Sequence, residues 1–517
     1  MESCRIRCLR SLLLTPCSVL CPFRLSRMII RVLSRRSCWV SRPARVIKAC
    51  DHCLEYSSPQ SYTDTLRVSK RREQMTLTFS IRFRHACLVL SVVATVLGQG
   101  AFAQDAIRGE IERRVDNRIL IAAPPPAAAS DALVSAGREI GEALVFDLTF
   151  TGLFKTLPPE LYPPGFVALP ANVQMLDFTS WRATGAEYLI YSLIYSEGNQ
   201  LVGEFRLFDL NAGNQVYGQQ VRVDLKSARL AAHRFSEEVV RYVDGTPGCA
   251  TSEIVFSGKT GDVKEIYVAD YDGFNARKLT EHGSISIKPK ISPDGNYVAY
   301  VSYKDRYSFL YVLDRRTGKT TPLSKEVGLN SAPSWSPDGR RIALTLSKDG
   351  NTEIYLRDPD GGNPVRLTKN RDGDTSPCFS PDGSKIAFVS DRAGMPQIFV
   401  MNADGSGQTR LSYHGGKAYD PVWSPDGTMI AFVSEIRGQG FEIYVMNADG
   451  SNPVQLTDSP GINESPSWSP DSRHVMFSST RNGRSELFAV NVRTREEIRI
   501  PYVTVSAEGP SWGPRRR

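Results

Sequence analysis

The chain has 517 residues, 41% hydrophobic and 23% charged, with 40 Gly, 32 Pro and a formal net charge of +8. This composition excludes a collagen, a coiled coil and a fully disordered chain, and the length predicts two to four domains. Residues 1–103 hold 17 Lys and Arg against five Asp and Glu, so the remaining residues carry a net charge of −4. Because the basic character is confined to this segment, we expect no nucleic-acid partner.

Residues 1–74 are rich in Arg and Ser and contain seven cysteines. Cys50 and Cys53 have CxxC spacing, but no second Cys or His pair follows at zinc-ligand spacing. We interpret residues 1–74 as the product of a start codon placed too far upstream. A signal peptide must lie near the amino terminus to function, so we expect translation to start at Met75. The alternative is an organellar transit segment, since few acidic residues precede Asp51.

Residues 75–103 are predicted to be a secretory signal peptide. Arg82 and Arg84 precede an apolar run, and Ala101 and Ala103 supply the small residues that signal peptidase accepts, with cleavage after the second. The apolar run is shorter than the ~20 residues of a membrane-spanning helix. We therefore expect a secreted chain that begins at Gln104 and has no membrane span.

Residues 118–248 contain no repeat and alternate between strand and helix patterns. A strand pattern at residues 118–122 precedes a helical pattern from Ser130 to Val145, with Ser130 as the expected N-cap. Three closely spaced strand patterns and a second helix follow, over residues 188–195, 201–210, 215–223 and 227–243. We expect a small α/β or α+β domain with mixed or antiparallel pairing.

The second half of the chain, residues 249–517, carries a repeat. Ser-Pro-Asp-Gly begins at positions 292, 336, 380 and 424, and degenerate copies follow at 469 and 513, so the spacing is 44 or 45 residues. Each repeat contains four short strand patterns bounded by turn residues, which is typical of a β-propeller blade. A large apolar residue precedes each motif and is expected to pack between blades: Ile291, Trp335, Phe379, Trp423, Trp468 and Trp512.

The repeat also predicts how the propeller closes. Patterns for the second strand of a blade start at residue 254, whereas patterns for the first strand start only at residue 287, and one extra first strand remains at residues 509–512. The economical solution pairs that last strand with the strand at residue 254. We therefore predict a six-bladed propeller in which the first and last strands of the propeller segment pair in one blade. This pairing closes the ring and leaves no open sheet edge.

A signal peptide, a small α/β domain and six Ser-Pro-Asp-Gly repeats, the last with a Trp-containing closing strand, together resemble the TolB family. The resemblance covers essentially all of residues 104–517. It implies a periplasmic, non-enzymatic adaptor of the Tol–Pal system, without cofactor or metal and monomeric in isolation. Such an adaptor binds the lipoprotein Pal and the inner-membrane protein TolA, and it maintains outer-membrane integrity and supports cell division.

The resemblance also suggests two binding regions. The TolA-binding arm would lie within residues 104–117, which are densely charged and include Gln104, Asp105, Arg108, Glu110 and Glu112. A disordered tail without a partner is the alternative. The Pal-facing rim would be formed by polar residues at equivalent repeat positions, namely Lys288, Asn330, Ser331, Asp374, Thr375, Tyr419, Asp420, Asn463, Glu464 and Glu508.

The main alternative is a secreted propeller that binds or hydrolyses a small carbohydrate or peptide in its channel. Hydrolases with similar blades need a G-x-S-x-G nucleophile elbow, which the sequence lacks. The histidines after residue 103 have no metal-binding spacing, and His233 is expected on a helix, at the surface or partly packed. Cys249 and Cys378 fall in separate blade regions, so we expect two unpaired thiols.

Overall fold

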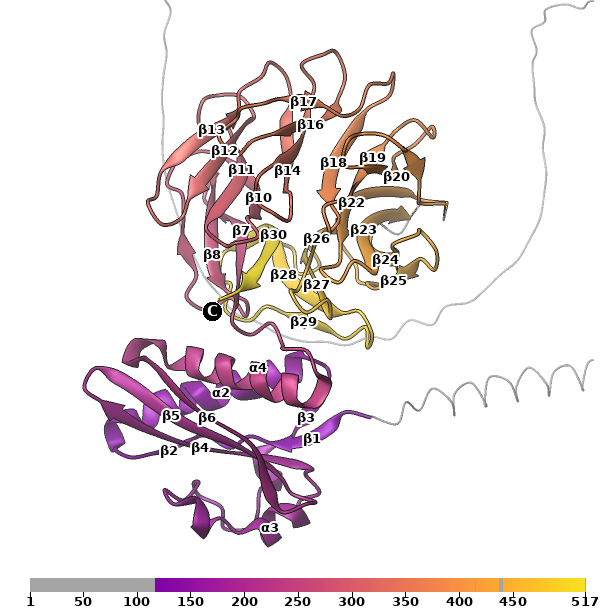
Figure 1. The fold of residues 1–517 in the computed structure, drawn as a ribbon. Coiled ribbons are helices and arrows are strands. Elements are labelled where there is room, and N and C mark those ends of the chain that lie inside the picture. The colour runs from indigo at the N-terminus through magenta and orange to yellow at the C-terminus, as the bar shows by residue number, and fades with distance from the viewer. Residues whose placement is uncertain (1–116, 414, 437–439, 517) are drawn as a thin grey trace, which may run out of the picture. The chain divides into compact units, whose positions relative to one another are not determined.

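The computed structural model describes residues 117–413, 415–436 and 440–516. The predicted leader, the signal peptide with Ala101 and Ala103, and the TolA-binding arm at residues 104–115 lie outside the described residues. Within these ranges the chain forms an amino-terminal α/β domain followed by a six-bladed β-propeller (Figure 1), as the sequence predicted.

The amino-terminal domain has one mixed sheet, ordered β3-β1-β4-β5-β6, with β2 paired to β4. Pairing is parallel between β1 and its neighbours β3 and β4, and antiparallel in the two predicted hairpins β4-β5 and β5-β6. The strands are β1 (Ile119–Ala122), β2 (Ala127–Ala128), β3 (Phe154–Thr156), β4 (Tyr188–Glu197), β5 (Gln200–Asp209) and β6 (Asn214–Asp224). The short strands β2 and β3 carry too few residues to show a period in sequence.

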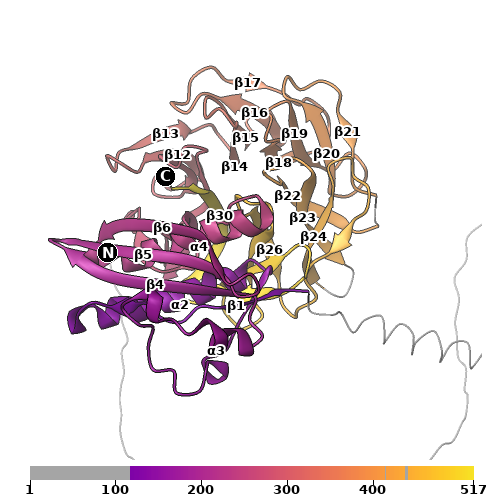
Figure 2. The same cartoon turned by 60° about the horizontal axis from the view of Figure 1, so that its bottom comes forward.

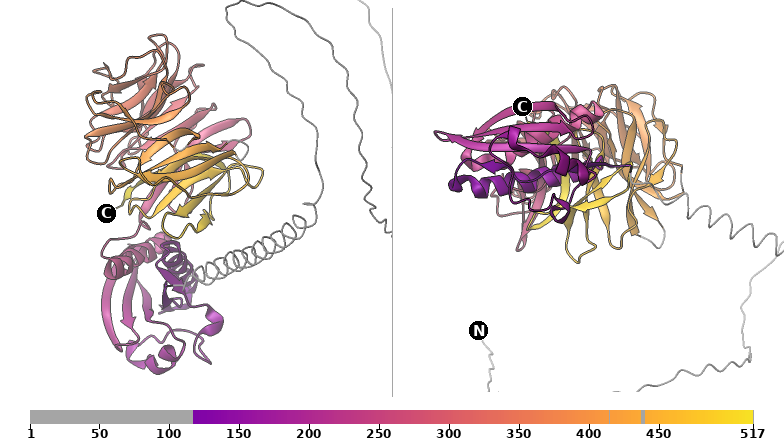
Figure 3. Two further views of the ribbon diagram at one scale, coloured as in Figure 1. Left: turned by 90° about the vertical axis from the view of Figure 1, so that its right-hand side faces the viewer. Right: turned by 90° about the horizontal axis from the view of Figure 1, so that it is seen from below.

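Helices α2 (Val134–Phe150) and α4 (Ala228–Asp244) lie side by side on one face of this sheet (Figure 3, left). Their apolar sides join the sheet in one core, which includes Ile140, Leu144 and Phe205. A short helix, α3 (Phe178–Ala183), is capped by the side chain of Asp177. Ser130 precedes a 3-10 turn rather than α2, and its side chain makes no capping hydrogen bond, so the predicted N-cap was wrong.

The propeller consists of six four-stranded antiparallel sheets arranged in a ring (Figures 1 and 2). Blade 1 contains β30 (Ser506–Arg515), β7 (Ser252–Thr260), β8 (Val263–Asp270) and β9 (Arg277–Lys278). Blade 2 contains β10 (Ser286–Ile291), β11 (Tyr297–Ser302), β12 (Phe309–Asp314) and β13 (Thr320–Ser324). Blade 3 contains β14 (Asn330–Trp335), β15 (Ile342–Leu346), β16 (Glu353–Arg357) and β17 (Val365–Arg366).

The remaining blades repeat this arrangement. Blade 4 contains β18 (Asp374–Phe379), β19 (Lys385–Ser390), β20 (Gln397–Asn402) and β21 (Thr409–Arg410). Blade 5 contains β22 (Lys417–Trp423), β23 (Met429–Ile436), β24 (Gly440–Asn447) and β25 (Val454–Gln455). Blade 6 contains β26 (Asn463–Trp468), β27 (His474–Ser479), β28 (Glu486–Asn491) and β29 (Glu497–Arg499).

The ring is closed as predicted, because the last strand β30 pairs with β7 in blade 1. In this register Trp512 lies opposite Ile254, and its indole Nε1 donates to Ser252 Oγ at 2.7 Å. The six large apolar residues before the repeat motif are buried in the clusters between neighbouring blades. They pack in the core between blades, as expected.

The Ser-Pro-Asp-Gly motif is a turn with its own hydrogen-bond set. In blade 2, Ser292 Oγ donates to Asp294 Oδ1 at 2.5 Å and accepts from the amide of Tyr297 at 2.9 Å. The amide of Gly295 donates to the Ser292 carbonyl, and its φ of 76° suits a residue without Cβ. The motif therefore recurs because blades 2 to 6 need the same turn from the first to the second strand, whereas in blade 1 these strands come from opposite ends of the propeller segment.

Candidate functional site

All first strands of the blades begin on the same face of the propeller, which we call the first-strand face. Because neighbouring strands are antiparallel, the loops between second and third strands open on this face as well. All ten residues that were predicted to form the rim lie at or near the start of a first strand, on β10, β14, β18, β22, β26 and β30.

Three of these ten residues are buried and support the loops from inside. Asn330 accepts from Ser324 Oγ at 2.7 Å, and Asp374 accepts from Arg392 at 2.7 Å. Asn463 is likewise buried and donates to Glu442. The repeat pattern placed them correctly along the chain, but burial depends on neighbouring loops that the pattern does not describe. These side chains are not available to a partner.

The other members of the rim reach the surface to different extents. Lys288 and Glu464 are exposed, and the rest are half-buried: Ser331, Thr375, Tyr419, Asp420 and Glu508. Glu508 is held by an ion pair of 2.5 Å with Lys264, whose strand lies in the same blade. These residues give the rim both signs of charge.

Exposed apolar side chains on the first-strand face were missed by sequence reasoning, which considered only polar residues there. They come from loops of several blades, and Tyr307, Tyr413 and Val327 are 67%, 71% and 87% exposed. The set comprises Ile285, Tyr303, Tyr307, Val327, Leu329, Met395, Tyr413 and Ile462. Single exposed apolar residues are common, but their concentration on one face is typical of a protein-docking surface. The presence of Tyr and Met residues in the loops next to the rim is the sequence signal that could have indicated this apolar surface.

A backbone irregularity at the start of each first strand shapes the centre of this face. The register between first and second strands shifts at the same place in blade after blade, for example between Ile287 and Lys290. One residue there has a positive φ in all six blades: Lys288, Ala332, Ser376, Asp420, Ser465 and Gly509. A proline follows each of them. These bulges redirect the side chains toward the channel.

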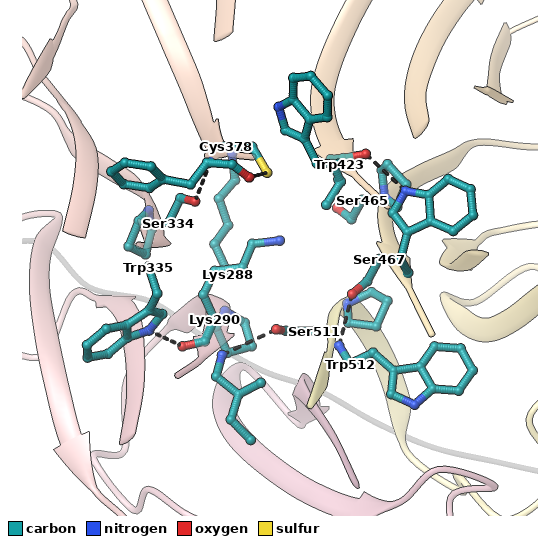
Figure 4. Close-up of a pocket in the computed structure, with 18 of the residues that line it drawn as sticks. Lys288, Lys290, Ser334, Trp335, Cys378, Trp423, Ser465, Ser467, Ser511 and Trp512 are labelled. Carbon is teal, nitrogen blue, oxygen red and sulfur yellow. Dashed lines mark hydrogen bonds between the residues drawn. The ribbon is translucent and has the colours of Figure 1, made fainter. Parts of the chain in front are cut away.

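The channel contains a cavity of about 430 Å³ that is lined by all six first strands. Its wall is made of the repeated prolines and backbone, with small side chains such as Ser334 and Ser467. Lys288 and Lys290 extend into it from β10 (Figure 4). The carboxylate of Asp420 also lines the cavity and accepts from Ser376 Oγ at 2.8 Å.

A cluster of buried ionisable residues joins the two domains at the opposite strand ends of the propeller. Asp147 on α2 accepts from Ser236 Oγ at 2.6 Å and from the hydroxyl of Tyr271 in blade 1 at 2.6 Å. His233 Nδ1 lies 2.9 Å from the same carboxylate. Burial lowers the pKa of His233, but Asp147 more than compensates, so this pKa is raised. His233 is 1% exposed, so the prediction of a surface or partly packed position was wrong.

The composition of this cluster is that of a hydrolase triad, but its geometry is not. The hydroxyl of Ser236 donates to Asp147 and to the carbonyl of His233, and it makes no bond to His233 Nε2. All three side chains are buried. A nucleophile must be paired with its base and be reachable by substrate. The cluster therefore serves to hold α2 and α4 against blade 1.

Further contacts reinforce the junction at the same strand ends. Arg229 on α4 forms a buried ion pair with Asp272, and Arg473 contacts Asp244. The ring of Phe150 stacks on His474 with centroids 4.3 Å apart, and burial lowers the pKa of His474 to about 4. These contacts leave the first-strand face available to other molecules.

The two thiols are unpaired in the described part of the chain: Cys249 is buried, and Cys378 lies in the channel wall. Burial raises the pKa of both thiols. Among the described residues, no helix is long and apolar enough to cross a membrane.

Comparison with known proteins gives a consistent picture. The model of the TolB beta propeller domain matches residues 241–516, and that of the TolB amino-terminal domain matches residues 108–216. The chain is 35% identical over 245 residues to the Tol-Pal system protein TolB of Roseobacter denitrificans, covering 46% of this chain and 54% of that protein. The corresponding protein of Geobacter sulfurreducens is 36% identical over 214 residues, covering 41% and 47%.

These alignments span about half the length of the curated relatives. The crystal structure of TolB from Acinetobacter baumannii matches with a TM-score of 0.69 at 24% identity, covering 77% of this chain and 97% of that one, which shows the shared fold. Two family models that between them match both domains, together with the observed architecture, place the chain in the TolB family.

Proposed function

We propose that this chain is a periplasmic, non-enzymatic adaptor of the Tol–Pal system. In this proposal a Pal-like lipoprotein docks on the first-strand face, and a TolA-like inner-membrane protein binds residues 104–115. The adaptor links the outer membrane and peptidoglycan to an energised inner-membrane complex, and so it maintains outer-membrane integrity and supports cell division. The names of the relatives motivate the choice of partners.

One observation carries the docking proposal: exposed apolar side chains gather on the face that the amino-terminal domain does not contact. The hydrogen bonds between the domains involve Tyr271, Arg473 and Asn491, which all lie at the opposite strand ends. Tyr and Met side chains around a polar rim have the composition of a protein interface. A folded domain can therefore approach the first-strand face directly.

The test measures binding of the lipoprotein's soluble domain by isothermal titration calorimetry. Tyr307 and Tyr413 are the most exposed aromatic side chains of the first-strand face. Truncating hot-spot tyrosines costs at least about 2 kcal/mol, so the double variant Tyr307→Ser/Tyr413→Ser should bind about 30-fold more weakly or worse. The control is Tyr242→Ser on α4, where the tyrosine is 47% exposed, and this variant should bind as wild type.

Both variants should melt within a few degrees of the wild type, because the substituted side chains are solvated. Deletion of residues 104–115 should abolish binding of the TolA-like protein and leave the fold intact. Failure of the wild-type chain to bind the lipoprotein would refute the adaptor role. Wild-type affinity in the double tyrosine variant would refute the docking face, and unchanged TolA binding after the deletion would refute the arm.

A further inference from the structure

The channel wall departs from its repeat at one position, Lys290. Each first strand carries a proline, then one residue, then the large apolar residue of the core. Only blade 2 places a charge between the proline and the core residue. The equivalent residues around the ring are Lys290, Ser334, Cys378, Val422, Ser467 and Ser511.

The serines at this level have a structural role that Lys290 does not share. The hydroxyl oxygens of Ser467 and Ser511 accept from the next blade's backbone amides, at 2.9 Å from Trp512 and 3.2 Å from Ile291. Ser334 accepts in the same way from the amide of Phe379 at 3.3 Å. They thus fasten neighbouring first strands together (Figure 4). Lys290 contributes only its carbonyl, which accepts from the indole of Trp335.

The ammonium group of Lys290 has no partner among the residues that the structure describes, because no hydrogen bond or ion pair reaches it. The same holds for Lys288, two residues earlier on β10. Desolvation in the channel wall lowers the pKa of Lys290, whose side chain is half-buried. A serine would fit this position as it does in three other blades, so packing between the blades does not require the half-buried cation of Lys290. The charge of Lys290 therefore points to a role outside folding.

The surroundings define what the pair of lysines can bind. Lys288 is exposed at the entrance of the cavity, and Lys290 lies two residues further along β10 and is half-buried. A group that enters from the first-strand face would therefore meet Lys288 first and Lys290 second. Among the described residues that line the cavity, Asp420 carries the one carboxylate, and it already accepts a hydrogen bond from Ser376. A cavity of about 430 Å³ has room for a few side chains but not for a folded domain.

We propose that Lys288 and Lys290 form a carboxylate-binding subsite, which receives an Asp or Glu side chain of the protein that docks on the first-strand face. The inference rests on the proposed function for the identity of the docking protein. It adds that the partner inserts an acidic side chain through the rim, and that two cations of blade 2 supply the complementary charge.

The first experiment compares Lys290→Met and Lys288→Met with a matched control, Lys319→Met. Lys319 is exposed in the β12-β13 turn of the same blade, on the opposite face. Binding of the lipoprotein's soluble domain is measured at low and high NaCl. Loss of one charge-assisted contact should weaken binding about tenfold or more in each channel variant and flatten the salt dependence. The control should match the wild type.

A second experiment tests the subsite without the lipoprotein. Four tryptophans line the cavity, so intrinsic fluorescence should report a small ligand. The probe is N-acetyl-aspartate methylamide, compared with its asparagine analogue and with inorganic phosphate. A saturable signal with the aspartate probe alone, lost in Lys290→Met, supports the proposal. Equal responses to aspartate and asparagine, or a response to phosphate only, would overturn it.

The outcomes separate this inference from the proposed function. If the lipoprotein binds and the channel variants retain wild-type affinity and salt dependence, the subsite is refuted while the adaptor role stands. If the lipoprotein does not bind at all, the adaptor role fails, and the aspartate probe still decides the subsite. Lys290→Met should also melt no lower than the wild type, since it removes an unpaired charge. A lower melting temperature with unchanged affinity would show a structural lysine.

Discussion

The buried cluster at the domain junction allows a quantitative test, with Asp147→Asn as the perturbation. Asp147 is 3% exposed and accepts from Ser236, His233 and Tyr271, so it connects both helices to blade 1. Asparagine has the same shape as aspartate but no charge. Its NH2 group would face hydrogen-bond donors of the cluster and could not accept hydrogen bonds from them. The substitution therefore isolates the electrostatic contribution of the carboxylate.

The expected loss follows from the contacts. Removing one partner of a buried ion pair costs about 3–5 kcal/mol. A single hydrogen bond to a charged acceptor contributes about 1.5–3 kcal/mol, which is the loss expected for Tyr271→Phe. We expect Asp147→Asn to lower the free energy of unfolding by at least about 3 kcal/mol. The combined variant should lose less than the sum, because both changes remove the same bond.

The effect should also depend on pH. The raised pKa of His233 means that the folded chain holds a proton more tightly than the unfolded chain. This contribution is fully present below the ordinary value of about 6.5 and is lost as the pH rises through the higher folded pKa. Asp147→Asn should therefore cost more at pH 5.5 than at pH 8.5.

Urea unfolding, followed by tryptophan fluorescence at the two pH values, measures both quantities. Tyr242→Ser serves as the control, because that side chain is exposed on the same helix as His233 and Ser236. A loss below about 1 kcal/mol that is equal at both pH values would refute the reasoning. It would mean that the cluster is neutral or that water solvates it in solution.

Two further predictions concern other parts of the fold. His474 is buried with a pKa of about 4, so unfolding takes up a proton between pH 6.5 and 4. The free energy of unfolding should therefore fall by about 3 kcal/mol as the pH drops through this window. The variant His474→Gln should flatten that part of the pH profile of stability, and an unchanged slope would contradict the assignment. Gly405 and Gly394 have similar φ angles of 91° and 84°, but a Cβ on Gly405 would lie 2.7 Å from the Leu367 carbonyl, whereas one on Gly394 meets nothing within 4 Å. Thermal unfolding should show that Gly405→Ala loses about 1–3 kcal/mol more than Gly394→Ala, and equal losses would show that the backbone yields at this point.

The architecture could be predicted from sequence because it repeats. Blades 2 to 6 use the same turn, and local hydrogen bonds such as those of Ser292 and Asp294 specify that turn without help from distant residues. Six copies at a fixed spacing also predicted the closing pair of β30 and β7. In the amino-terminal domain the long strands and helices were found, but β2 and β3 were too short to show a pattern.

The candidate site was predicted only in part. Equivalent repeat positions bring Lys288, Tyr419 and Glu464 to one face, because a propeller turns sequence period into spatial position. Burial did not follow from the period: Asn330 and Asp374 occupy predicted rim positions but turn inward to support loops. Their partners lie on other loops, whose lengths and conformations vary between blades.

The sequence by itself thus determined the turns, the number of blades and the strand that closes them, since each depends on local chemistry repeated at a regular interval. Only the tertiary structure decided which side chains are buried together. His233 joins Asp147 across 86 residues and Tyr271 meets the same carboxylate across 124 residues, to form the domain junction. The other five blades have uncharged residues at the position of Lys290, and closure of the six strands into a channel places its ammonium group where none of the described residues pairs with it. Packing between segments that are distant in sequence determines which side chains are buried, and burial in turn determines their pKa values and ion pairs. A local sequence pattern contains no information about this packing.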